Sequence, residues 1–346
     1  MRTEPDVDPQ RLLAVLRSRY QLDVERLDFV PLGIDSWSYV AALRDGGRCF
    51  LKLVRALPVR SMAPGSELPM VAALASLDRV HVARPIADRD DRLMQTFDGF
   101  ALCLLEYLDG HALADEETWP DDLYGRVADA VAAIHASTSE VRSLVPGTER
   151  FELPFLASLV GTLAIHGAGG PLPDDLRVML TPAVRELHRG IERLEELRDF
   201  ARSVHTDEVL CHTDIWGSNL LLSGAGVLHV LDWSGAMIGP LEADLFMFAG
   251  TSFFPAGRFG WFLDRYEAAF RRVHLDADVL GFYLYRRNLE DLASFVEAVA
   301  EGNSEAMDRR ETLGYVAALL AELPRLEEQI RRIRRVLQGR PSAARA

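Results

Sequence analysis

Lysine is almost missing from this sequence of 346 residues. Of its 38 basic residues, Lys52 is the one lysine and all the others are arginines. Such a bias indicates that a lysine survives where a compact ammonium on a thin stem is needed and the planar guanidinium of arginine cannot serve. The alternative is that Lys52 was retained by chance. The residues around Lys52 have to distinguish a functional lysine from a chance one.

An excess of positive charge is missing as well. The chain carries 52 acidic residues and a formal net charge of -14. Nucleic-acid binding proteins usually carry the opposite charge, so we expect no nucleic-acid partner. An acidic surface favours a cationic small molecule as ligand, although many acidic proteins are simply soluble.

Long apolar runs and cysteines are scarce. No uncharged apolar run approaches the roughly 18 residues of a membrane-spanning helix, and residues 1–10 lack the apolar segment of a signal peptide. The three cysteines, Cys49, Cys103 and Cys211, are widely spaced and odd in number, which is typical of reduced thiols. We therefore expect no membrane partner and a cytoplasmic location. Hydrophobic residues make up 49%, which is enough for a folded core.

The first third of the chain is predicted to be rich in strands. Short runs of β-branched and aromatic residues are separated by turn residues, and Gly46–Gly47 is typical of a tight hairpin. We predict helices over 9–20 and 67–77, and strands over 27–30, 38–43, 48–54, 82–86, 93–97 and 100–107. These elements form a predicted domain of residues 1–107.

The rest of the chain has mostly helical spacing. We predict helices over 122–136, most of 150–204, 259–273, 277–300 and 304–337, with strands inside 209–230. Residues 108–346 therefore form a second, mostly helical predicted domain, and the fold class is α+β.

Polar residues interrupt the apolar strands within 209–230. His212, Asp214 and Asn219 follow the first strand in the spacing H-x-D-x-x-x-x-N, and Asp232 follows a later strand. This arrangement is typical of phosphoryl transfer. Asp214 can accept the proton of an acceptor hydroxyl, while Asn219 and Asp232 offer the hard oxygen ligands that Mg²⁺ prefers.

Other residues occur in the order that a kinase requires. Lys52 lies in the third predicted strand, where it can bind phosphates, and Glu67 on the next helix can pair with it. The turn from Gly33 to Ser36 can cover the phosphates. The backbone from Glu106 to Leu108 can bind an adenine. Taken singly, Glu67 is also explained as a first-turn acid and the Gly33 turn as a plain hairpin.

The sequence resembles the aminoglycoside phosphotransferase and choline-kinase-like family of small-molecule kinases. The resemblance is carried by residues 50–53, 133–136, 212–219 and 232–245. It implies a bilobal protein-kinase-like fold, with a small antiparallel-sheet N-lobe and a larger helical C-lobe, and ATP or GTP bound with Mg²⁺. It also implies Asp214 as catalytic base, Asn219 and Asp232 as magnesium ligands, and Lys52 with its partner Glu67 on the phosphates.

Two details refine the resemblance. The family usually has glycine between the histidine and the aspartate, where this chain has Thr213. Residues 33–39 and 232–237 are most similar to antibiotic phosphotransferases of the spectinomycin and hygromycin kind. We therefore expect an aminoglycoside-like antibiotic as acceptor, with a small metabolite such as choline, homoserine, thiamine or a sugar as the alternative.

Several residues have a structural explanation beside the functional one. His212 is expected to brace the loop, and His135 to be a buried structural histidine. Glu290 and Asp291 could bind a substrate ammonium, but they could equally pair with arginines one turn away on their own helix. A metallohydrolase site of His205 with His212 lacks the usual metal-ligand spacing.

Two other functions compete with a small-molecule kinase. A protein kinase is disfavoured because no Asp-Phe-Gly or Ala-Pro-Glu segment follows Asn219. A catalytically silent nucleotide-binding module is disfavoured by the intact set of Lys52, Asp214, Asn219 and Asp232. The sequence predicts no oligomeric state.

Overall fold

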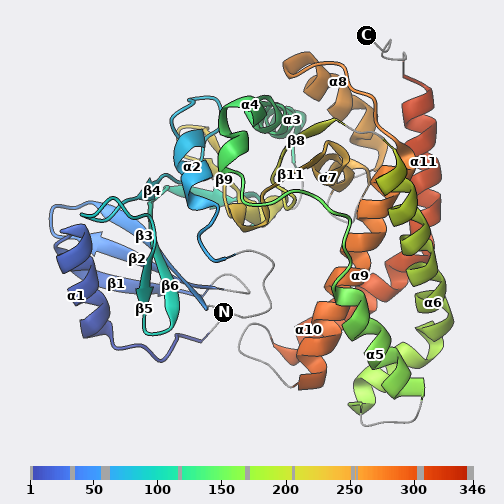
Figure 1. The fold of residues 1–346 in the computed structure, drawn as a ribbon, viewed down its shortest axis with the longest axis horizontal. Helices are drawn as coiled ribbons and strands as arrows, with labels where there is room; N and C mark the ends of the chain where they lie inside the picture. The colour runs from blue at the N-terminus through green and yellow to red at the C-terminus, as the bar shows by residue number, and fades with distance from the viewer. Residues whose placement is uncertain are drawn as a thin grey trace. The chain divides into compact units, whose positions relative to one another are not determined.

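We analysed a computed structural model of the protein, which describes residues 3–31, 36–55, 63–115, 119–167, 172–204, 207–250, 254, 256–301 and 308–340. Contacts divide the chain into two compact units. Unit 1 comprises residues 1–148 and 212–238, and unit 2 comprises residues 149–211 and 239–346. The two are described separately, and Figure 1 labels their helices and strands.

An antiparallel sheet dominates the first part of unit 1 (Figure 1). Its strands are β1 (Val24–Val30), β2 (Ser36–Leu43), β3 (Arg48–Arg55), β4 (Pro85–Ile86), β5 (Gln95–Phe97) and β6 (Phe100–Glu106). The order is β1-β2-β3-β6-β4, and β5 also pairs with β6. The predicted hairpin of β2 and β3 is confirmed, with Ala42 opposite Arg48. The strand β3, which carries Lys52, is therefore a central strand.

The core of this sheet explains where Lys52 points. Alternate residues of β3, among them Leu51 and Leu53, are buried in a cluster with Leu12 and Leu16 of α1 (Pro9–Tyr20). Successive side chains of a strand lie on opposite faces, so Lys52 lies on the face away from α1. The predicted helix over 9–20 is confirmed. It covers one face of the sheet, and Lys52 lies on the other face of β3.

The other elements of unit 1 are short apart from one helix. They are α2 (Leu68–Leu74), η1 (Leu113–Asp115), α3 (Asp121–Ala136), α4 (Thr138–Val141), η2 (Arg142–Leu144), η3 (Gly217–Asn219) and η4 (Trp233–Gly235). A second sheet has the order β10 (Leu228–Val230), β9 (Leu220–Ser223) and β7 (Gly110–Ala112). Helix α2 is shorter than predicted. The strand predicted over 82–86 is limited to Pro85 and Ile86, and Val82 is buried outside any strand.

Unit 2 is mostly helical, as predicted. Its helices are α5 (Phe155–Gly167), α6 (Asp174–Ser203), α7 (Glu242–Leu245), α8 (Phe259–Ala269), α9 (Ala277–Glu301), α10 (Arg309–Glu322) and α11 (Leu326–Gln338), with 3-10 turns η5 (Phe246–Phe248), η6 (Ala256–Arg258) and η7 (Leu323–Arg325). Strand β8 (Glu208–Cys211) belongs to unit 2, and β11 (Met237–Pro240) spans the boundary. The helix predicted over 304–337 is divided by η7, which contains Pro324. A proline lacks the N–H that a continuous helix needs.

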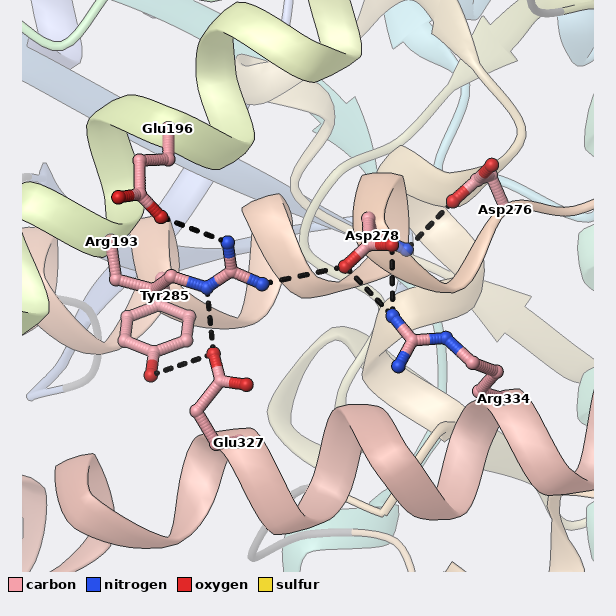
Figure 2. Close-up of polar contacts among 7 residues, drawn as sticks. All are labelled: Arg193, Glu196, Asp276, Asp278, Tyr285, Glu327 and Arg334. Carbon is pink, nitrogen blue, oxygen red and sulfur yellow. Dashed lines mark hydrogen bonds and ion pairs between the residues drawn. The ribbon is translucent and has the colours of Figure 1, made fainter.

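An ion-pair network joins three helices of unit 2 (Figure 2). Arg193 of α6 donates to Glu327 of α11 at 2.8 Å and lies 3.5 Å from Asp278 of α9. Arg334 of α11 binds both oxygens of Asp278, at 3.0 and 2.8 Å. A bidentate arginine–carboxylate pair has a specific geometry, so this network fixes how α6, α9 and α11 pack.

The two units do not follow the predicted boundary after residue 107. Residues 108–148 and the loop of residues 212–238 have their contacts in unit 1. The division into lobes of residues 1–107 and 108–346 stays a prediction. Among the residues that the structure describes, no helix combines the length and apolarity needed to span a membrane.

Candidate active site

The loop of residues 212–219 leaves strand β8 and ends in the 3-10 turn η3, directly before β9. Asn219 donates two hydrogen bonds from Nδ2 to Asp214, one to the backbone oxygen at 2.9 Å and one to Oδ2 at 2.8 Å. Asn219 is buried, so its amide fixes the orientation of the Asp214 carboxylate. Both bonds use the amide nitrogen, and Oδ1 is therefore the atom with which Asn219 can bind a cation.

His212 braces this loop, as predicted. The ring is fully buried, and its Nδ1 accepts a hydrogen bond from the backbone N–H of Asp214 at 3.3 Å. The other ring nitrogen, Nε2, is then the donor of a hydrogen bond to the backbone oxygen of Leu231 at 2.9 Å. One ring thus joins the backbone beside Asp214 to the backbone beside Asp232.

The hairpin of β9 and β10 brings Asn219 and Asp232 to the same end. Leu220 pairs with Val230, and the N–H of Leu231 donates to the backbone oxygen of Asn219 at 2.8 Å. Asp232 follows with a φ of 57°, in the left-handed region. The sequence prediction that strand ends hold these polar groups together is confirmed by this register.

Lys52 forms an ion pair with Asp232, with 3.0 Å between Nζ and Oδ1. Burial disfavours the charge on Lys52, but the attraction of Asp232 outweighs it and raises the pKa of Lys52. Burial also disfavours the charge on Asp232, yet Lys52 and a hydrogen bond from Ser234 lower the pKa of Asp232. Both groups therefore stay charged at neutral pH.

Glu67 and Cys103 lie close to this ion pair. Cys103 of β6 is opposite Lys52 in the register of β3 and β6. Burial raises the pKa of the Cys103 thiol to about 12, so it remains a neutral thiol beside Lys52. Glu67 precedes α2, and its negative charge contributes to the raised pKa of Lys52. The predicted pairing of Glu67 with Lys52 stays a prediction, because the recorded ion pair of Lys52 is with Asp232.

The remaining predicted nucleotide-binding residues lie on the same sheet. Ser36 begins β2, is buried and is opposite Val54 of β3. Glu106 ends β6 and donates its backbone N–H to the oxygen of Arg84 at 2.8 Å, while Leu108 is half-buried just beyond the strand. Residues 33–35 of the predicted phosphate-covering turn, and His205 of the metallohydrolase alternative, lie outside the described residues.

This geometry can be compared with known proteins. The sequence matches the model of the phosphotransferase enzyme family, abbreviated APH, over residues 29–283. The chain belongs to this family. It is therefore a small-molecule phosphotransferase, and the predicted family is confirmed.

Solved structures of similar fold share little sequence with this phosphotransferase. A spectinomycin phosphotransferase in complex with ADP and spectinomycin has a TM-score of 0.76 and 16% identity, covering 94% of this chain and 100% of its own. A microcompartment-associated aminopropanol kinase has a TM-score of 0.63 and 18% identity, and the match covers 93% of this chain and 98% of the kinase. A choline/ethanolamine kinase family protein from Mesorhizobium loti has a TM-score of 0.60 and 17% identity, and the match covers 96% of this chain and 99% of that protein. These likenesses confirm the α+β, protein-kinase-like fold.

The donor atoms of the phosphotransferase suit a magnesium ion. Oδ1 of Asn219 and the carboxylate of Asp232 are hard oxygens, and Mg²⁺ is usually bound by one or two such protein groups together with phosphate oxygens. The backbone bond between Leu231 and Asn219 keeps the two side chains at one end of the hairpin. Lys52 already binds one oxygen of Asp232, which fixes the direction of that carboxylate.

Glu290 and Asp291 lie on α9 in unit 2, and each has an arginine partner one turn earlier. Arg286 lies 3.6 Å from Glu290, and Arg287 donates to Asp291 at 2.7 Å. These are the pairs that the structural explanation expects. The role of Glu290 and Asp291 in binding a substrate ammonium stays a prediction.

Sequence reasoning missed the glycines that let the loop pack. A Cβ on Gly217 would lie 2.7 Å from the backbone nitrogen of Ala114 in η1. A Cβ on Gly110 of β7 would lie 2.5 Å from the backbone oxygen of Leu222 in β9. Both are close backbone approaches, which only glycine allows. Gly217 lies inside the H-x-D-x-x-x-x-N segment, and a glycine within this motif could have indicated a close backbone approach.

Proposed function

We propose that the protein is a kinase that transfers the γ-phosphoryl group of ATP, or of GTP, to a hydroxyl of an aminoglycoside-like antibiotic. The observation that carries this proposal is the ion pair of Lys52 with Asp232 in the same compact unit as the bonded pair Asp214 and Asn219. Phosphoryl transfer relies on positioning and on stabilising charge, and these four residues supply both.

Each of the four residues has a separate part in the proposed reaction. Asp214, held by the Asn219 amide, accepts the proton of the attacking hydroxyl. Asn219 and Asp232 would hold a magnesium ion, which neutralises charge on the transferring phosphates when bound. The ammonium of Lys52 binds phosphate oxygens, and its charge is secured by Asp232. Glu67 supports that charge from the start of α2, while Ser36 and the backbone from Glu106 to Leu108 contact the nucleotide.

The choice of acceptor rests on fold and charge. The spectinomycin phosphotransferase aligns over nearly the whole of both chains. The net charge of -14 favours a cationic acceptor. An antibiotic acceptor would make the protein a resistance enzyme, with the cytoplasm as its proposed location.

A metabolite kinase is the second candidate. The aminopropanol kinase and the choline/ethanolamine kinase family protein share the fold with TM-scores of 0.63 and 0.60. The names of these two proteins refer to small amino alcohols, which are also cationic. A silent nucleotide-binding module is the third candidate, although it would not need the oriented carboxylate of Asp214.

A coupled ADP-release screen separates these candidates. The purified protein is given MgATP with aminoglycosides, spectinomycin, macrolides or amino alcohols, GDP release is measured in a parallel series with MgGTP, and Asp214→Asn is run beside both. We expect acceptor-dependent ADP release with an antibiotic, and its loss in the variant. Release with amino alcohols alone would support the metabolite kinase. Binding of MgATP without release in any mixture would support the silent module.

A further inference from the structure

Thr213 has an unusual backbone conformation directly before the proposed base. Its φ is 72°, in the left-handed region, where a β-branched residue is a true outlier. Glycine adopts this region without steric cost, whereas threonine does not. A strained threonine persists only where the surroundings compensate for it, so its side chain should have a specific contact.

The hydroxyl of Thr213 makes such a contact. Its Oγ1 donates to the backbone oxygen of Gly235 at 3.1 Å. A Cβ on Gly235 would lie 2.6 Å from the same Oγ1. The hydroxyl can therefore occupy this place only because residue 235 is a glycine, and the two positions fit each other.

This hydrogen bond links the two halves of the proposed site. Thr213 lies between the bracing His212 and the base Asp214. Gly235 ends η4, three residues after Asp232, the proposed magnesium ligand. A glycine at position 213 would relieve the backbone strain but would remove the hydrogen bond to Gly235. The links already described run through His212 to Leu231 and through Asn219 to Leu231, and the Thr213 bond adds a link on the far side of Asp232.

We propose that Thr213 is a positioning residue whose hydroxyl sets the distance between the base Asp214 and the metal-binding Asp232. This inference rests on the function proposed above. The reacting groups of an in-line transfer must be aligned closely, and a displacement of about 1 Å can cost about 100-fold in rate. Loss of the bond should therefore lower kcat more than it raises the KM for MgATP, because it acts on Asp214 directly, whereas Asp232 keeps its ion pair with Lys52.

Three substitutions separate the hydroxyl from the strain. Thr213→Val keeps the branched shape and removes the hydroxyl, Thr213→Gly removes the strain and the hydroxyl, and Thr213→Ser keeps the hydroxyl. We expect kcat to fall about tenfold or more in the Val and Gly variants, with a smaller change in the KM for MgATP, and Thr213→Ser to keep most of the wild-type kcat. Thr181→Val is the matched control, since Thr181 donates to a backbone oxygen within α6 of unit 2.

Amide hydrogen exchange of residues 212–216 provides a readout that does not need an acceptor. We expect faster exchange in Thr213→Val and Thr213→Gly than in wild type, and wild-type exchange in Thr213→Ser. If wild type transfers phosphate to no acceptor, the proposed function fails while the exchange still tests the link. Wild-type exchange in Thr213→Gly, or wild-type kcat in an active Thr213→Gly enzyme, would overturn the proposal.

Discussion

At the scale of single residues, the site depends on how a few polar atoms are oriented. Lys52 and Asp232 are 180 positions apart in the chain and 3.0 Å apart in the fold. Asn219 directs the Asp214 carboxylate, and His212 directs the backbone on either side. Each of these groups has a partner within the protein, and such contacts contribute to the positioning that phosphoryl transfer needs.

Replacing Lys52 by arginine should weaken nucleotide binding although the charge is kept. Lys52 is paired with Asp232 and lies opposite Cys103, and the wider guanidinium needs more room between them than the ammonium does. Charged hydrogen bonds contribute about 1.5–3 kcal/mol, so we expect at least about tenfold weaker binding of MgADP in titration calorimetry. Arg26→Lys on β1 is the control, since its side chain is 69% exposed. Wild-type affinity in Lys52→Arg would refute the explanation given for the single lysine.

At the scale of elements, backbone packing places these side chains. The alternation of β3 puts Lys52 on one face and the core leucines on the other, and the hairpin of β9 and β10 brings Asn219 towards Asp232. The turn η3 packs so closely on η1 that a methyl group at Gly217 would meet the backbone of Ala114. The loop is therefore held in place by main-chain contacts as well as by its polar side chains.

A methyl group at Gly217 should displace the loop. Overpacking costs about 1–3 kcal/mol, so Gly217→Ala should lower the unfolding free energy by about this amount and reduce turnover. Gly224→Ala is a matched control in the turn between β9 and β10, because a Cβ there meets nothing within 4 Å. Urea unfolding and ADP release measure the two effects. Equal stability of both variants would show that the approach of η3 to η1 is not tight.

The short helix α7 should make stability depend on pH. Glu242 is buried and accepts a hydrogen bond from the backbone N–H of Asp276 at 3.0 Å. Burial raises the pKa of Glu242 from 4.5 to about 7. The folded protein then binds more protons than the unfolded chain between these two values, so stability falls as pH rises through this window and is constant above it. The total loss is about 3 kcal/mol.

Glu242→Gln should remove this loss, because glutamine keeps the acceptor for Asp276 and cannot ionise. Thermal unfolding between pH 5 and pH 8 should show a smaller decrease for the variant than for wild type. Glu195→Gln, an exposed position on α6, should behave as wild type. The same pH dependence in wild type and Glu242→Gln would rule out Glu242 as its cause.

Local signals in the sequence predicted many of these elements correctly. The hairpin of β2 and β3 and the helix α1 were found because alternation, turn residues and helical spacing are local properties. Strand β7 was missed, since three residues that begin with glycine carry no strand pattern and pair only through the close approach of Gly110. Glu67 was predicted as the partner of Lys52, and the ion pair with Asp232 was not predicted, because no spacing in a sequence shows which distant residues meet.

At the scale of the whole molecule, the chain belongs to a phosphotransferase family and has a protein-kinase-like fold. Unit 1 alone contains Lys52, Asp214, Asn219 and Asp232. Unit 2 contributes helices that are joined by ion pairs such as the network around Arg193. Family and fold specify the chemistry, whereas the acceptor depends on side chains that vary between members of one fold.

The most direct test of the site compares Asp214→Asn with wild type in two measurements on the same preparations. Titration calorimetry gives the affinity for MgADP, and ADP release gives turnover with the best acceptor. A positioned base contributes about 100- to 10,000-fold, so we predict a loss of turnover in this range with MgADP affinity preserved. Near-normal turnover of Asp214→Asn would contradict the account.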